Sequence, residues 1–113
     1  MTARFFISLP DPDAVHTAGP FAFRSRGAEG IADELRAALR TDGLFQRWRA
    51  VQEDPDAVDP AMGAIDPDTT VTGTQNDLHV ELVVVSSISS SVLRHRLRLL
   101  AGHAWQLRDV TAA

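Results

Sequence analysis

Two ionisable side chains, His79 and Glu81, stand two residues apart in a stretch that is rich in β-branched apolar residues. Residues i and i+2 of a β-strand point to the same face of a sheet, so these two side chains share a face. A histidine beside a carboxylate is suited to general acid–base catalysis. His79 and Glu81 are therefore the catalytic candidates, and Arg4 and Arg108, predicted on the same sheet face, are the ligand-binding candidates.

Five serines between Ser86 and Ser91 precede a predicted helix. Helix N-termini bind anions through their free N–H groups, but serine is also a preferred capping residue. No glycine-rich phosphate loop accompanies the run, and the chain has no lysine to complete one. We interpret the serines as a helix cap.

The helix that follows carries several basic residues. Arg94, His95 and Arg98 lie outside the apolar arc of the helix, whereas Arg96 falls inside it. We interpret the first three as a solvent-exposed face. For Arg96 three roles stay open: its stem snorkels to the surface, it pairs with a carboxylate, or it anchors an anion. The helical projection predicts that Glu34, at the border of another apolar arc, approaches Arg96.

Metal and cofactor motifs are not found in the sequence. The chain has no cysteine, and its four histidines lack the spacing of a zinc site. The Asp-Pro-Asp elements at 11–13, 54–56 and 66–68 are turn chemistry and lack the regular ligand spacing of a calcium loop. We expect no metal and no cofactor.

Length and composition bound the class of protein. The 113 residues suffice for a single domain, 1–113, and the 44% hydrophobic and 23% charged content is that of a globular chain. No apolar stretch approaches the length of a membrane span, and no secretory signal is visible. A net charge of −4 disfavours general nucleic-acid binding. We expect a cytoplasmic protein with no membrane partner, and we rank nucleic acid below a protein as its partner.

Hydrophobic periodicity and turn residues predict the secondary structure. In chain order the expected elements are a strand at 3–9, a short extra strand at 21–24, helices at 28–42 and 44–51, a helical turn at 60–62, strands at 69–74 and 78–87, a helix from Ser89–Ser91 to Ala101, and a strand at 105–110. Apart from the extra strand and the short helices, the order is βαββαβ. This order predicts an α+β, ferredoxin-like fold, with four antiparallel strands and the helices on one face. The strands at 3–9 and 78–87 are the most apolar, so they should be central.

The other sheet face is predicted to be partly apolar. The inward-facing residues are expected to be Phe5, Ile7, Leu78, Val80, Leu82, Val84, Trp105 and Leu107. Phe6, Val83, Val85 and Val110 then form an apolar patch on the opposite face, which is the candidate interface. That face could instead be covered by Phe21–Phe23 or enclose a pocket. A single stacking aromatic, Phe6, disfavours an RNA-binding platform.

Three function hypotheses follow, because the sequence identifies no ligand, substrate or pathway. The first is a non-enzymatic interaction or accessory domain that forms a homodimer through its open sheet face, or that binds another protein there. The alternative is a small dimeric α/β-barrel enzyme or small-molecule binder, whose cavity includes His79, Glu81, Arg4 and Arg108. The third is a nucleic-acid binder that uses the arginine-rich helix and whose binding depends steeply on salt.

Overall fold

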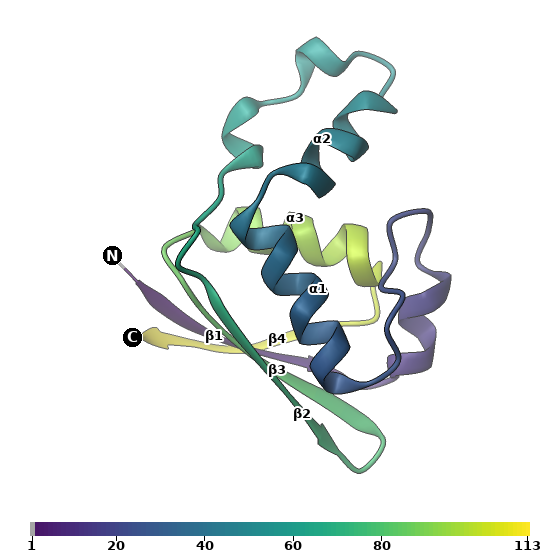
Figure 1. The fold of residues 1–113 in the computed structure, drawn as a ribbon, viewed down its shortest axis with the longest axis vertical. Coiled ribbons are helices and arrows are strands. Elements are labelled where there is room, and N and C mark those ends of the chain that lie inside the picture. Colours follow the sequence, from purple (N-terminus) through teal and green to yellow (C-terminus); the bar gives the residue numbers. More distant parts are fainter. Residues whose placement is uncertain (1) are drawn as a thin grey trace.

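The computed structural model describes residues 2–113 and shows an α+β fold with one open antiparallel sheet (Figure 1). Its elements are, in chain order, β1 (Ala3–Leu9), η1 (Pro12–Thr17), α1 (Ala28–Arg40), α2 (Gly43–Ala50), η2 (Pro55–Ala57), η3 (Pro60–Gly63), β2 (Thr70–Asn76), β3 (His79–Ser86), α3 (Ser90–Ala101) and β4 (Gln106–Ala112), where η denotes a 3₁₀ helix. The predicted strand at 3–9 and the predicted single turn after Asp59 are confirmed.

The strands are arranged in the order β2-β3-β1-β4, and every neighbouring pair is antiparallel. The prediction that the two most apolar strands are central is therefore confirmed. Each central strand is hydrogen-bonded on both sides, and one of its faces is covered by the helices. The runs of Val, Leu and Ile in β1 and β3 suit this buried environment.

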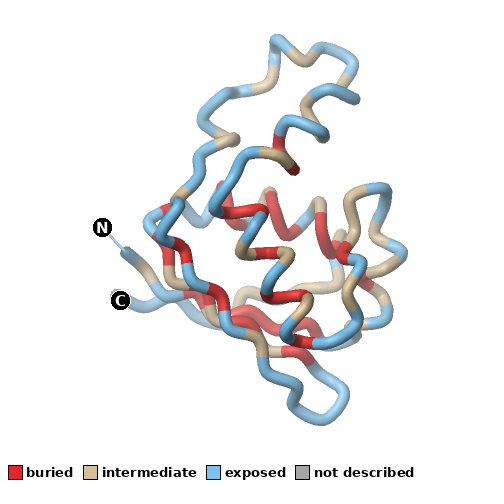
Figure 2. Tube along the Cα trace, viewed as in Figure 1, coloured by how far each residue is buried: buried red, intermediate tan, exposed pale blue. Residues whose placement is uncertain are grey.

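The core lies between the sheet and the helices α1 and α3, which sit on the same side of the sheet (Figure 1). Figure 2 shows the buried residues concentrated in this layer. Ile7 and Val84 contribute to it from the sheet, and Leu35 and Leu97 from the helices. With one exception, the inward residues predicted on the two central strands are buried. Leu78 is not: it belongs to the β2–β3 turn and is 82% exposed, because β2 extends to Asn76 and the chain reverses at Asp77, whose φ is +55°.

The edge strand β2 packs closely against the start of α1 at Gly73. A Cβ atom built on Gly73 would collide with the carbonyl oxygen of Ala28 and would also crowd the side chain of Ala32. The absence of a side chain at this position lets the helix approach the strand backbone.

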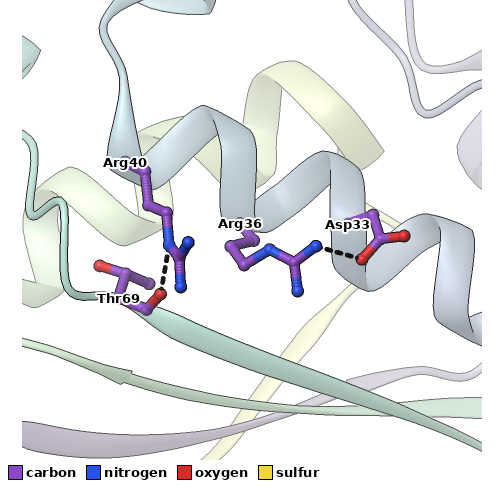
Figure 3. A network of polar contacts seen from close by, with 4 residues as sticks. All are labelled: Asp33, Arg36, Arg40 and Thr69. Atoms are coloured by element: carbon purple, nitrogen blue, oxygen red, sulfur yellow. Dashed lines mark hydrogen bonds and ion pairs between the residues drawn. The ribbon is translucent and has the colours of Figure 1, made fainter.

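Polar contacts attach the C-terminal half of α1 to the beginning of β2 (Figure 3). Arg40 Nε donates a 2.7 Å hydrogen bond to the carbonyl oxygen of Thr69, which is fully buried. One turn earlier, Arg36 pairs with Asp33 at 2.6 Å on the helix surface. The Arg40 bond satisfies a buried carbonyl beside the sheet edge, so it contributes more than the exposed ion pair does.

The ends of α3 follow the local signals in the sequence. Ser89 is the N-cap, and its Oγ accepts the N–H of Val92 at 3.2 Å. Gly102 follows the last turn with φ +60°, a conformation that glycine adopts without steric cost. Both predicted ends are confirmed.

Residues 43–65, comprising α2, η2, η3 and their links, form a lobe that extends away from the sheet (Figure 1). Arg96 of α3 joins this lobe to the body of the protein. Its side chain is fully buried and donates to three carbonyl oxygens: Nε to Ala38 at 3.3 Å, Nη1 to Met62 at 2.6 Å, and Nη2 to Ala64 at 3.2 Å. The guanidinium also lies 5.3 Å from the ring centroid of Phe45.

The expected Arg96–Glu34 contact is wrong. The Glu34 carboxylate instead accepts the backbone N–H groups of Arg24 and Ser25, at distances down to 2.8 Å. Burial lowers the pKa of Arg96, and Asp42 opposes that shift. Arg96 therefore bonds to backbone carbonyl groups, and not to the carboxylate that its position on the helix predicted.

The expected strand at 21–24 is also wrong. Residues 22–26 have no regular secondary structure, and the N–H of Phe23 donates to the carbonyl oxygen of Leu100, at the end of α3. Phe23 is buried in the core between sheet and helices. The end of a helix has free carbonyl groups, and here one of them takes the donor that a neighbouring strand would have used.

Candidate functional site

The open face is the side of the sheet opposite the helices (Figure 1). On it Phe6 of β1 stands directly across from Val83 of β3, and Val85 stands across from Arg4. Directly paired residues of an antiparallel sheet share a face, so Phe6, Val83 and Val85 form one patch on the two central strands. All three are half-buried. We call these three residues the apolar patch.

Threonines of the edge strand border the apolar patch. Thr70 and Thr72 of β2 pair with Val85 and Val83, and both threonines are exposed. Their methyl groups extend the apolar surface, and their hydroxyls remain in contact with water.

Val110 does not belong to the apolar patch, contrary to the sequence prediction. The pairing of β4 with β1 contains an irregularity at Arg108: Phe6 pairs with Asp109, whereas Ile7 pairs with Leu107. One extra residue in a strand reverses the alternation of all residues beyond it. Val110 therefore pairs with Phe5 on the helix-facing side, where it is 46% exposed at the end of the sheet.

A polar zone lies beside the apolar patch. Ser8 pairs with Glu81 on one side and with Gln106 on the other. The Ser8 hydroxyl is buried between these longer side chains and donates to Glu81 Oε1 at 3.4 Å. Glu81 is thus held in place beside Ser8 and has no hydrogen bond to His79 among the described residues.

The four charged candidates do not converge on one point. Arg4 pairs with Val85, and His79 lies six residues away from Val85 along β3, roughly 20 Å at 3.3 Å per residue. Arg108 donates to Gln106 Oε1 at 2.8 Å on β4. Arg4, His79 and Arg108 are all exposed. His79 and Glu81 remain neighbours on β3, and none of the hydrogen bonds or ion pairs within residues 2–113 joins either of them to Arg4 or Arg108.

The segment Phe21–Phe23 does not cover the open face. Phe21 and Phe23 pack against the core cluster, and Ala22 and Phe21 line a groove beside α1. The three helices also lie on the other side of the sheet (Figure 1). Within residues 2–113, therefore, no helix covers the apolar patch.

The serine run is used to organise the start of α3. The hydroxyl of Ser86 bonds to Thr69 Oγ1 at 2.7 Å and donates to Asp66 Oδ2 at 3.2 Å, and the N–H of Ser87 donates to the same carboxylate oxygen at 2.9 Å. Hydrogen bonds lower the pKa of Asp66. The largest effect comes from the backbone N–H of Ser87, and the next from the backbone N–H of Asp68, which donates to the other carboxylate oxygen. The anion beside this loop is thus a carboxylate of the protein itself.

Among the described residues, no group of three or more histidine or acidic side chains is placed to hold a metal ion. Across residues 2–113, none of the helices has both the length and the apolar character required to cross a bilayer. No known protein family, curated protein or solved structure matches this chain.

Proposed function

We propose that this chain is a ferredoxin-like interaction domain that forms a homodimer through its open sheet face. The observation that carries the proposal is the Phe6–Val83 pair, with Val85 beside it, on the two central strands. An apolar patch at the centre of a sheet loses contact with water when a second sheet packs on it, and this burial drives association.

The charges around the apolar patch favour a second copy as the partner. Along β1, Arg4 lies two residues before Phe6, and Ser8, paired with Glu81, lies two residues after it. Two sheets packed face to face can be related by a two-fold axis that runs between them, perpendicular to the strands at Phe6. This axis brings the start of β1 in one copy opposite the end of β1 in the other. It therefore places Arg4 of one copy beside Glu81 of the other, twice in the dimer. The same axis places Asp109, which pairs with Phe6 on β4 and is exposed, opposite its own copy, so the two Arg4–Glu81 contacts must outweigh one like-charge contact.

Light scattering coupled to size exclusion tests the proposal. The wild type should have the mass of a dimer at tens of micromolar, and Val83→Glu should have the mass of a monomer, because two carboxylates would face each other at the centre of the interface. Val51→Glu is the matched control, because Val51 is 69% exposed on the 43–65 lobe, which extends away from the sheet (Figure 1). This variant should remain dimeric.

A charge reversal sharpens the test. Arg4→Glu should weaken the dimer by placing like charges together, and Arg4→Glu combined with Glu81→Arg should restore it. A wild type that is monomeric at high micromolar concentration contradicts the homodimer. So does a dimer that Val83→Glu leaves intact.

A further inference from the structure

A groove of about 530 Å³ opens between the C-terminal half of α1, the first turn of α2 and the loop at residues 20–24. Its volume lies in the range of small-molecule sites, about 300–1,000 Å³. The helices that line it lie on the helical side of the sheet (Figure 1), so a partner on the open sheet face would leave the groove accessible.

Small residues create the space. Ala22, Ala37 and Gly43 line the three sides of the groove, where larger side chains would fill it. Leu44 and Leu100 lie beneath it and are both buried, so its accessible apolar surface comes from residues such as Phe21, Ala22 and Ala37, beside polar groups. The groove can therefore accept an apolar group without displacing a core side chain.

The loop that forms one wall is fixed in place by hydrogen bonds. The N–H of Phe23 donates to Leu100 at 2.8 Å, and Nδ1 of His16 donates to the carbonyl oxygen of Phe23 at 2.8 Å. Glu34 Oε2 accepts the N–H of Ser25 at 2.8 Å. This wall is held without a ligand, so binding would cost little ordering of the loop.

Two cations line the groove from opposite walls, Arg24 from the loop and Arg47 from α2. The ion pairs found within residues 2–113 involve other arginines, Arg36 and Arg49. The acidic side chain in the lining, Glu34, has both oxygens engaged by backbone N–H groups. The groove thus combines a partly apolar lining with two arginines and one carboxylate, a net charge of +1.

We propose that this groove binds a small amphipathic carboxylate, with its alkyl or aromatic body against the apolar part of the lining and its carboxylate near Arg24 or Arg47. The apolar body supplies affinity through burial, and the arginines select an anionic head group over a neutral or cationic one. Because both arginines are exposed to solvent, each should contribute modestly.

Octanoate is the probe, and amide chemical shifts of the full chain are the readout. Octanoate should shift amides of residues 21–24, 37–44 and 47 in a saturable manner, and octylammonium, with the same tail and opposite charge, should bind more weakly. Arg47→Gln should weaken octanoate binding roughly two- to fivefold. Arg94→Gln, an exposed arginine outside the groove lining, should leave it unchanged.

Filling the groove provides the second test. Ala37 is exposed and lines the groove, so Ala37→Trp should abolish octanoate binding while the remaining spectrum stays that of the folded protein. Ala50→Trp, at an exposed position outside the groove lining, is the matched control and should bind octanoate normally.

Three outcomes overturn the proposal: no saturable shifts at millimolar octanoate, equal binding of octylammonium, or binding that survives Ala37→Trp. Each can be distinguished from failure of the proposed dimer, which is measured by molecular mass without any ligand.

Discussion

The Nη1 atom of Arg96 lies 2.6 Å from the carbonyl oxygen of Met62, a residue 34 positions away along the chain. The same guanidinium reaches the last turns of α1 through Ala38 and the end of η3 through Ala64. A single buried cation thus attaches the 43–65 lobe to both helices of the main layer. Hydrogen bonds to backbone carbonyls offset part of the free-energy cost of removing this cation from water, and the face of the Phe45 ring stabilises it further.

Arg96→Ala should lower the free energy of unfolding by about 3 kcal/mol, because three carbonyl groups lose their donor and a buried volume is emptied. Arg94→Ala, at an exposed position of the same helix, should change it by less than about 0.5 kcal/mol. Urea denaturation of both variants measures the difference. Equal and small effects would show that Arg96 does not hold the lobe.

Gly73→Ala should lower the free energy of unfolding by roughly 2 kcal/mol, because the added methyl group meets the Ala28 carbonyl and forces α1 away from β2. The control is Gly43→Ala at the start of α2, where the nearest atom to a new Cβ is a flexible arginine nitrogen at 3.6 Å. That change should be neutral or stabilising by up to about 1 kcal/mol. Thermal unfolding of the two variants compares them, and a neutral Gly73→Ala would contradict the close approach.

Stability should fall as the pH falls below about 6.5, through His95. Burial, followed by the charges of Arg96 and Arg98, lowers the pKa of His95 from its ordinary value of 6.5. His95 is therefore not part of the solvent-exposed face that its helical position predicted: it is half-buried, and its ring lies 4.4 Å from that of Trp48. The unfolded chain therefore binds more protons than the folded chain between the two pKa values, and acid favours unfolding. Urea midpoints measured from pH 8 to pH 5 should show this loss.

The matched variant for that experiment is His95→Leu, which keeps an apolar group against Trp48 and removes the titrating ring. Its stability should depend less on pH between 8 and 5 than that of the wild type. An unchanged pH dependence would assign the effect to another group.

Asp66→Asn should reduce stability at neutral pH, and the difference from the wild type should shrink in acid. The backbone N–H of Ser87 and its other hydrogen bonds lower the pKa of Asp66 below its ordinary value of 3.8. A lowered carboxyl pKa contributes stability that is present above the unfolded value and lost as the pH falls through the folded value. Melting temperatures from pH 7 to pH 2.5 test this, with the exposed Asp68→Asn as control. A constant difference across that range would exclude the linkage.

Local patterns in the sequence were sufficient for most of the secondary structure. The alternation from Ala3 to Leu9 produces β1, the 3.6-residue period after Ala28 produces α1, and Ser89 and Gly102 delimit α3. In each case the determinant acts within a few residues: a pleat that alternates side chains, an apolar helical face, a capping hydroxyl, or a residue that accepts positive φ. The apolar character of β1 and β3 likewise indicated that they are central.

The partners of individual side chains depended on the tertiary structure. Phe23 looks like a strand residue, but its N–H bonds to the end of α3. Arg96 has the helical position of a residue that could meet Glu34, yet both have stronger partners elsewhere, because the loops that supply these partners are placed only by the complete fold.

The open face shows the same division. Period-two alternation correctly placed Phe6, Val83 and Val85 together, since an uninterrupted pairing of β1 with β3 preserves their register. It misplaced Val110, because the extra residue at Arg108 exists only in the pairing of β4 with β1. The groove beside α1 was equally invisible in the sequence. Its lining combines residues from four separate segments, and their separation in space is decided by how the helices pack on the sheet.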